Sequence, residues 1–364
     1  MSRQALLHWL RPGRHPAPLL GVDLGSHGVR LVELGGSAGQ PVLACALREP
    51  LQVGWIRNGQ VEDFDAVAEA VRRAVRRSGT RTRRAALALP AAGVITQRLR
   101  LPAGLDGAAL EQRVASEAQP QLPFEPEEAC LDFCALGPAG EGELEWLVVA
   151  SRQDRVQDRQ GLAEAAGLEP VLLDVESHAV HRAVARLVAR WPAPEGEGTG
   201  TPAAPVALFD IGAFATTLKL LRGEDGLYER HLPVGGAQFT RLIAGRCGLG
   251  FDAAEQAKLA GTLPPDLAPA LQADFVDGLA QELARALQIG FASGPCQRVR
   301  GVLLAGATAT LPGLAPRVSQ LTGFETRLAD PFDGFTIGLG AWPAAHEAGG
   351  FLTACGLALR RFLP

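Results

Sequence analysis

The stretch GVDLGSHGVRLVEL, residues 21–34, decides how the rest of the chain is interpreted. Apolar residues stand on both sides of a glycine-rich turn, and this pattern predicts a β-hairpin. Glycines let the backbone of the turn bend, so that successive N–H groups can converge on a phosphate. Asp23 ends the first expected strand and offers a carboxylate to a hydrated Mg²⁺ on that phosphate. The sequence therefore predicts a phosphate-binding turn at Gly25, Ser26, His27 and Gly28.

A second hairpin of the same pattern lies in VALFDIGAFATTLKL, residues 206–220. There Asp210-Ile211-Gly212 corresponds to Asp23-Leu24-Gly25. Either copy alone has an equally good alternative as an ordinary buried hairpin, because apolar-Asp-apolar-Gly is a common pattern. Two copies, each near the start of one half, indicate a duplicated α/β fold that holds one nucleotide between two lobes. This arrangement resembles the actin-like ATPases, whose lobes are duplicated RNase H-like domains with mixed sheets.

Composition limits the class of protein. The chain has 364 residues, enough for two or more domains and a large core. Its net charge of −4 argues against a nucleic-acid partner, which usually requires a basic face. Six cysteines are scattered without metal-ligand spacing, and a reducing cytoplasm is the simplest fit. No run of about 18 apolar residues occurs, so no membrane span is expected.

The expected elements divide the chain at a linker. Residues 191–205, WPAPEGEGTGTPAAP, are rich in Pro, Gly and Thr. Residues 94–151 show the order strand–helix–strand–strand and predict a small inserted subdomain. The expected organisation is a disordered tail (1–18), lobe I (19–90 and 154–192) with its inserted subdomain (91–153), a linker (193–204), lobe II (205–340) and a C-terminal helix returning to lobe I (341–364).

Residues 63–77 have the spacing of an amphipathic helix with an arginine-rich outer face. Its buried face is expected to consist of Phe64, Val67, Ala68, Val71 and Val75.

Further residues are candidates for the nucleotide site. Gly306, Ala307 and Thr308 follow a buried strand, where a tight turn could admit an adenine. Glu255 and Lys258, three residues apart on one helix, could reach the ribose or base. The alternative is that they form a surface ion pair, which would contribute about 0.3 kcal/mol to stability. The remaining candidates are Gly212, Ala213, Thr216, Gly235 and Gly236 for the phosphates, and Asp23, Asp210 and Glu176 for the metal.

Several catalytic motifs are missing from the sequence. Neither lysine, Lys219 or Lys258, follows a glycine, so there is no Walker A loop. The motifs His-Glu-x-x-His and Gly-x-Ser-x-Gly are absent as well. No catalytic residue is therefore assigned.

Taken together, these motifs resemble the family of type IV pilus assembly protein PilM, a relative of the cell-division protein FtsA. The most specific part is residues 89–137, in which a strand, an acidic helix, Pro-Phe and a closing Leu-Asp-Phe match a module that general actin relatives do not share. The resemblance covers about residues 19–364. It continues in order through FDIGAFATT, HLPVGG, DAAEQAKLAG, LLAGATATLPGL and TACGLALR.

The resemblance implies a cytoplasmic, ATP- and Mg²⁺-binding actin-like scaffold of the pilus machine at the inner membrane, with weak or no ATPase activity. It also implies binding of the cytoplasmic N-terminal tail of PilN in a groove beside the inserted subdomain, where an extended peptide could pair with the backbone. Other inner-membrane pilus assembly proteins and weak self-association complete the expected partners. No nucleic acid and no direct membrane span are expected.

Three departures from the family pattern bear on nucleotide affinity. Arg30, a candidate phosphate ligand, stands where the family usually has lysine, and a guanidinium is bulkier and differently hydrated. Ala307 replaces a glycine; if this position needs a positive φ or close approach of the base, the methyl would cost about 1 kcal/mol, roughly fivefold in affinity. Pro120 interrupts the subdomain helix earlier than expected.

Two other functions are open to a chain of this kind. A sugar or acetate kinase shares the superfold, but would need a base near the γ-phosphate, and residues 91–150 offer no obvious catalytic set. An FtsA-like division protein would reach the membrane through an amphipathic C-terminal helix, whereas residues 359–364 follow the last packing helix directly. The cytoplasmic part of a type II secretion protein would be expected to carry a transmembrane segment.

Overall fold

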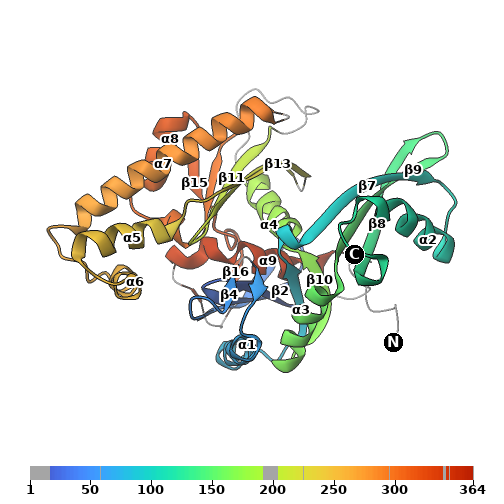
Figure 1. Cartoon of the computed structure of the whole chain (residues 1–364), viewed down its shortest axis with the longest axis horizontal. Helices are drawn as coiled ribbons and strands as arrows, with labels where there is room; N and C mark the ends of the chain where they lie inside the picture. The colour runs from blue at the N-terminus through green and yellow to red at the C-terminus, as the bar shows by residue number, and fades with distance from the viewer. Residues whose placement is uncertain are drawn as a thin grey trace. The chain divides into compact units, whose positions relative to one another are not determined.

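The computed structural model describes residues 17–57, 59–191, 204–223, 225–294, 296–338, 342–343 and 345–363. The chain forms two compact units, which we treat one at a time (Figure 1). Unit 1 comprises residues 1–179, 335–342 and 353–364, and unit 2 comprises residues 180–334 and 343–352. Most of the expected N-terminal tail and of the expected linker lies outside the described residues.

A mixed sheet forms the centre of unit 1. Its first three strands are an antiparallel meander, and the next two lie parallel to the first strand on its other side. The strand order is β10-β6-β1-β2-β3-β16. The strands are β1 (Leu20–Gly25), β2 (Gly28–Gly36), β3 (Pro41–Pro50), β6 (Arg84–Leu89), β10 (Glu169–Val175) and β16 (Thr336–Ile337), with a separate small hairpin of β4 (Ile56–Arg57) and β5 (Gln60–Val61).

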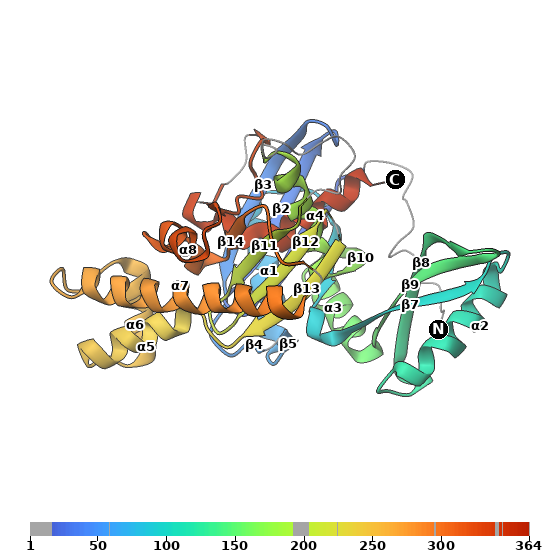
Figure 2. The same cartoon turned by 90° about the horizontal axis from the view of Figure 1, so that it is seen from above.

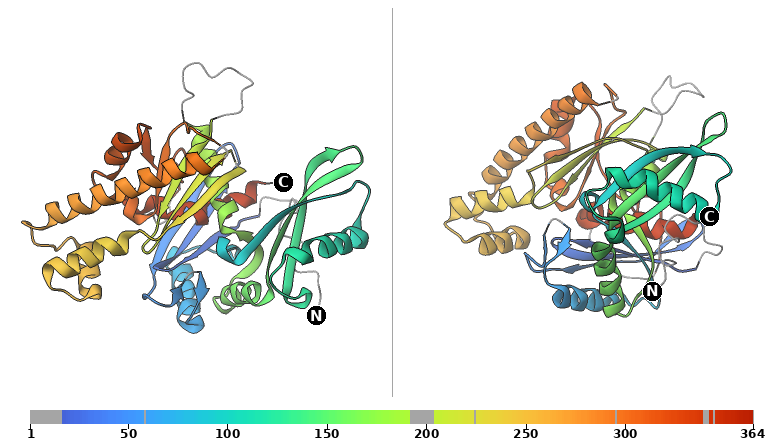
Figure 3. Two further views of the ribbon diagram at one scale, coloured as in Figure 1. Left: turned by 45° about the horizontal axis from the view of Figure 1, so that its top comes forward. Right: turned by 45° about the vertical axis from the view of Figure 1, so that its right-hand side comes forward.

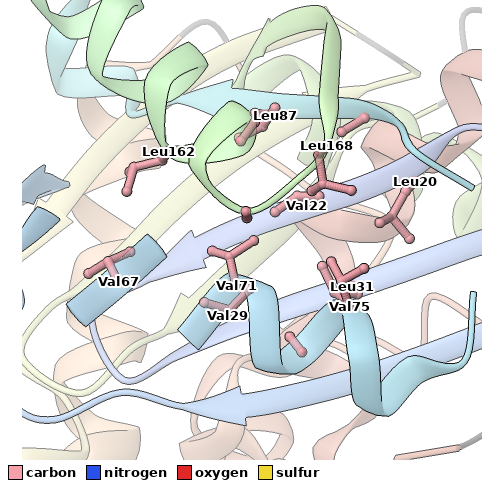
Figure 4. Packing of buried hydrophobic residues seen from close by; sticks show 14 of the residues in the cluster. Leu20, Val22, Val29, Leu31, Val67, Val71, Val75, Leu87, Leu162 and Leu168 are labelled. Carbon is pink, nitrogen blue, oxygen red and sulfur yellow. The ribbon is translucent and has the colours of Figure 1, made fainter. Parts of the chain in front are cut away.

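Helices α1 (Phe64–Ser78) and α3 (Gln153–Ala165) cover one face of this sheet. α1 begins where the Asp63 side chain accepts a hydrogen bond from the Ala66 amide at 3.0 Å, and ends at Gly79 with φ 69°. Figure 4 shows Val67, Val71 and Val75 pointing toward the strands. The expected position of Phe64 is wrong. As the first residue of the helix it is 39% exposed, and its ring lies against Gly161 of α3.

The inserted subdomain has the predicted order of elements. β7 (Val94–Pro102), α2 (Gly107–Ala118), β8 (Ala129–Gly140) and β9 (Glu143–Arg152) form an antiparallel sheet of order β7-β9-β8, with α2 packed beside it (Figure 3). Its own small core includes Leu101, Leu110 and Val148, with Phe133 and Trp146 in edge contact at 5.6 Å. α2 ends at Ala118, directly before a 3₁₀ turn that contains Pro120, because proline lacks the backbone N–H that would continue the hydrogen bonds of the α-helix.

The end of the chain, residues 353–364, belongs to unit 1. α9 (Leu352–Ala358) brings Leu357 into a cluster with Leu19, Ala86 and Leu172. The backbone of α9 at Gly356 lies directly against the backbone at Ala179. A Cβ atom on Gly356 would lie 1.8 Å from the Ala179 carbonyl oxygen, so there is no room for a side chain. α4 (Glu176–Ala189) follows β10 directly.

Unit 2 repeats the sheet of unit 1. Its strand order is β13-β12-β11-β14-β15, again an antiparallel meander followed by two parallel strands. The strands are β11 (Val206–Ile211), β12 (Thr216–Arg222), β13 (Asp225–Leu232), β14 (Val302–Ala305) and β15 (Thr326–Leu328). If the short edge strand β16 is set aside and the strands of each sheet are numbered in chain order, both sheets have the order 3-2-1-4-5. This agreement confirms the predicted duplication of RNase H-like lobes.

Four helices accompany the sheet of unit 2: α5 (Gly236–Cys247), α6 (Phe251–Ala260), α7 (Ala268–Ser293) and α8 (Leu314–Thr322). The long α7 runs beside β12 and β13 (Figure 2). Phe239 of α5 stacks on Phe275 of α7 with ring centroids 5.0 Å apart, which joins the helices to the core. None of the helices in the described part of the chain has the length and apolar character needed to cross a membrane.

The backbone contact at Gly356 gives a test of how unit 1 is closed. Gly356→Ala should lower the free energy of unfolding by about 1–3 kcal/mol, because neither backbone can move away without disturbing the core. Gly245→Ala is the matched control, since Gly245 also lies within a helix and a Cβ there meets nothing within 4 Å. The control should raise stability by about 0.5–1 kcal/mol. Equal denaturation midpoints for the two variants would contradict the tight contact.

Candidate phosphate turns and nucleotide site

The first predicted turn is a tight connection between β1 and β2, in which Gly25 pairs with Gly28 and only Ser26 and His27 lie between them. Residues of β3 and of the segment after it hold this turn in place. The His27 carbonyl accepts hydrogen bonds from Arg48 Nη2 at 3.2 Å and from the Leu51 amide at 3.3 Å. Gly28 has no room for a side chain, because a Cβ would lie 2.9 Å from the Glu49 carbonyl oxygen. The glycines therefore serve close backbone packing as well as turn geometry.

Asp23 and Arg30 face each other across this hairpin. Arg30 Nη1 donates to Asp23 Oδ2 at 3.2 Å, and both side chains are mostly buried, at 17% and 15% exposure. A Cβ on Gly25 would lie 2.8 Å from the same Nη1, so the glycine makes room for the guanidinium. Arg30 thus reaches the turn where the sequence places a phosphate ligand.

Burial raises the pKa of Asp23, and the charges of Arg30 and Arg159 partly oppose that rise. Arg159 was not among the predicted site residues. It belongs to α3 and is 4% exposed, and its Nη2 donates to the Gly59 carbonyl. The only signal in the sequence is a charged residue within the apolar spacing of residues 156–163, which is too weak to identify a site.

Glu176 lies at the same edge of the sheet as Asp23. β10 pairs in parallel with β6 through Val175 and Leu89, and Glu176 is the next residue and starts α4. β6 in turn pairs in parallel with β1, which carries Asp23. Unit 1 therefore places two of the three carboxylates that were predicted for the metal at one edge of its sheet, along with the Gly25–Gly28 turn.

In unit 2 the second turn is built from backbone contacts. The Gly212 amide donates to the Ala215 carbonyl at 2.9 Å, and the Gly236 and Ala237 amides donate to the carbonyls of Gly212 and Ala213 at 3.0 and 2.7 Å. A Cβ on Gly235 would lie 2.5 Å from the Gly212 carbonyl oxygen. The predicted residues of both glycine segments thus form one cluster in space.

Thr216 and Asp210 complete this cluster. Thr216 is fully buried, and its hydroxyl donates to the Val234 carbonyl at 2.8 Å, so it holds the strand that leads into Gly235. Asp210 lies beside Ala305 in the parallel pairing of β11 and β14, and hence next to Gly306. Its partner in the hairpin register is Thr217, whereas Asp23 faces an arginine. The two turns therefore match in backbone but differ in charge.

The turn after β14 accommodates alanine. Gly306 carries the left-handed φ of 86°, and a Cβ there would lie 2.3 Å from the Ile211 carbonyl oxygen. Ala307 is the first residue of a 3₁₀ helix (Ala307–Thr310), a right-handed conformation that alanine adopts without strain, and it is exposed. Thr308 Oγ1 approaches Gly236, where a Cβ would lie 2.6 Å away. The conformational part of the expected penalty at Ala307 is therefore absent from this structure.

Glu255 and Lys258 form the ion pair that the alternative expected, and Lys258 also contacts a buried threonine. Their charged atoms are 2.6 Å apart, and the side chains are 23% and 18% exposed. Thr240, which is fully buried, accepts a hydrogen bond from Lys258 Nζ at 2.9 Å, and its hydroxyl is also within hydrogen-bond reach of Glu255 and the Gly236 carbonyl. Sequence reasoning missed Thr240, although it lies one helical turn after Gly236.

The donor set fits a hydrated Mg²⁺ that reaches the protein with phosphates. Mg²⁺ keeps several waters and takes only one or two carboxylates. Arg30 engages Oδ2 of Asp23 alone, so the carboxylate keeps a second oxygen for a water ligand.

Comparisons with known proteins agree with this architecture. A family model described as type IV pilus assembly protein PilM matches residues 21–362. A solved structure titled "PilM-PilN type IV pilus biogenesis complex" is similar with a TM-score of 0.73 and 28% identity, over 95% of this chain and 99% of that chain. These two matches do not favour the small-molecule kinase or the FtsA-like division protein.

More distant structures share the fold alone. The ethanolamine utilization protein EutJ from Carboxydothermus hydrogenoformans has a TM-score of 0.55 and 19% identity, over 98% of this chain and 94% of that chain. A diol dehydratase-reactivating factor in nucleotide-free form has a TM-score of 0.51 and 10% identity, over 94% of this chain and 99% of that chain. The fold is the expected two-lobed actin-like one, and because the family model spans nearly the whole sequence, the chain belongs to the family of type IV pilus assembly protein PilM.

Proposed function

We propose that this protein is a nucleotide-responsive scaffold of type IV pilus assembly, which binds ATP with Mg²⁺ and the cytoplasmic N-terminal tail of PilN. The observation that carries the proposal is the family match over residues 21–362, in a chain whose two units each contain a glycine turn beside a strand-end carboxylate. PilN enters as the partner named with the similar solved structure. The protein works in the cytoplasm, next to the inner membrane and its other assembly proteins.

In this proposal both turns bind one ATP. Arg30 and the amides of residues 25–28 contact the phosphates from unit 1, and the turn of Gly212 and Ala213 contacts them from unit 2. Mg²⁺, when bound, neutralises part of the phosphate charge. Asp23, Asp210 and Glu176 orient its water ligands. In this proposal the scaffold hydrolyses ATP slowly or not at all.

The network around Thr240 positions the nucleoside. Lys258 donates to Thr240 and pairs with Glu255, so its ammonium is held in one place before the ligand arrives. A preorganised cation of this kind can donate to a ribose hydroxyl or a base nitrogen at little entropic cost. Ala307, exposed at the start of its 3₁₀ helix, contacts the base in this proposal.

Partner binding belongs to the inserted subdomain. Its sheet has the order β7-β9-β8, so β7 and β8 are both edge strands with backbone groups that an extended peptide can pair with. The PilN tail therefore binds beside this subdomain within unit 1. In this proposal, bound nucleotide changes the affinity of the groove for the peptide.

Lys258→Ala tests the nucleoside site. Removing the ammonium takes away one charged hydrogen bond to the ligand and leaves Glu255 unbalanced, so ATP affinity should fall about tenfold. Lys219→Ala is the matched control. Lys219 is the chain's other lysine and also pairs with a glutamate, Glu229, at 2.8 Å, but on β12 and β13. The measurement is titration calorimetry with ATP and Mg²⁺, after melting curves show that both variants fold. Unchanged affinity in Lys258→Ala would remove the residue from the site.

Titration with a peptide of the PilN tail, in the presence and absence of ATP and Mg²⁺, tests partner and coupling together. We expect binding in both conditions, with an affinity that differs at least about fivefold between them, since a coupling of about 1 kcal/mol is ordinary for linked sites. Equal affinity would leave the partner in place and eliminate the coupling. A scrambled peptide of the same composition is the control, and if the PilN peptide binds no better than this control, the partner itself is wrong.

A further inference from the structure

Arg159 is a guanidinium buried without an ion pair. It is 4% exposed, its Nη2 donates to the Gly59 carbonyl, and its Nε makes no hydrogen bond. Within the part of the chain that the structure describes, no carboxylate lies within the 4.0 Å of a salt bridge to it. A buried charge in such surroundings is costly unless other charges compensate for it. The compensation must come from carboxylates somewhat farther away.

The backbone places the head of Arg159 at the edge of the sheet that carries the proposed metal ligands. Gly59, which accepts its hydrogen bond, lies against Pro90, where a Cβ on the glycine would meet the proline ring at 2.4 Å. Pro90 directly follows β6, and β6 lies between β1, which carries Asp23, and β10, which Glu176 follows. The guanidinium therefore sits at the strand end between these two acidic residues.

Most of the charges that act on Arg159 are negative. Burial lowers the pKa of Arg159, and the negative charges of Asp23, Asp158 and Glu176 counteract this effect, with Arg155 acting the other way. Arg30 is the second cation at this edge, but it is 17% exposed and lies at the phosphate turn, so it can exchange Asp23 for a phosphate. Arg159 is buried, and its Nη2 already donates to the Gly59 carbonyl, so it is less available to a ligand than Arg30.

We propose that Arg159 is a resident counter-cation, which balances Asp23 and Glu176 when no nucleotide–metal complex is bound and which weakens the binding of a divalent cation at this edge. The inference rests on the proposed nucleotide function, since it assigns the charge balance of that same site. Arg159 is a positioning residue, because it acts on the ligand through Asp23 and Glu176. Arg30 is then free to leave Asp23 for the phosphates without exposing an unbalanced buried carboxylate.

The first test uses Mg²⁺ alone, titrated into the full chain without nucleotide and followed by thermal unfolding. Arg159→Gln should melt at a lower temperature than the wild type in EDTA, and Mg²⁺ should restore much of the loss. Its half-saturating Mg²⁺ concentration should be at least about fivefold lower than that of the wild type, because a repelling charge is gone. Arg159→Lys, which keeps the charge, should behave much more like the wild type.

Arg73→Gln is the control. Arg73 is another arginine of unit 1, and unlike Arg159 it pairs directly with a buried carboxylate, Glu49, at 3.0 Å. It should lose some stability with no added response to Mg²⁺. If Arg159→Gln behaves in the same way, Arg159 only packs the core and the proposal is overturned.

A second test remains informative even if Arg159→Gln folds poorly. In the double variant Asp23→Asn/Arg159→Gln the amide needs no counter-charge, so the double variant should melt at a higher temperature than Arg159→Gln alone. Strictly additive losses would overturn the proposal. Both tests are independent of nucleotide. If positions 23 and 159 are coupled but the protein does not bind ATP, the proposed function is refuted and the charge balance stands. If the protein binds ATP but the two positions are not coupled, only the charge balance is refuted.

Discussion

Parallel pairing of β1, β6 and β10 is the constraint on which the rest of unit 1 depends. Parallel strands end at the same edge of a sheet, so the residues at their carboxyl ends lie near one another. Here this edge collects two carboxylates, Asp23 and Glu176, from segments about 150 residues apart in the sequence, as expected where ligand sites form at strand ends. The cost of gathering negative charge in a mostly buried place is then met by arginines from β2 and α3.

The two units show how one backbone plan carries different electrostatics. Their sheets have the same order and their first hairpins the same Asp-apolar-Gly turn. In unit 1 the aspartate faces Arg30, and in unit 2 it faces Thr217. The only Glu–Lys–Thr network described here belongs to unit 2. The two copies of the sheet therefore carry different side-chain networks on the same backbone plan.

The sequence was most informative where a signal is local. Glycines beside an aspartate, alternation of apolar residues and a proline after a helix identified both hairpins, the inserted subdomain and the end of α2. The sequence was less informative about residues whose role depends on contacts with distant parts of the chain. Phe64 has the right period for the core, but at the first turn of α1 it packs on α3 instead. Arg159 and Thr240 carry no motif, and their importance depends on Gly59 and Lys258, which approach them from other elements.

The contact between Gly356 and the Ala179 carbonyl also has a consequence for the order in which the protein forms. Unit 1 is discontinuous, and the cluster around Leu19 lacks Leu357 until the ribosome has reached that residue. The core of unit 2 around Phe239 and Phe275 draws on a single continuous stretch of residues 207–318. During synthesis, the second unit can therefore mature while the first, although begun earlier, still exposes the surface that α9 will cover, and this surface is a natural point for chaperone contact.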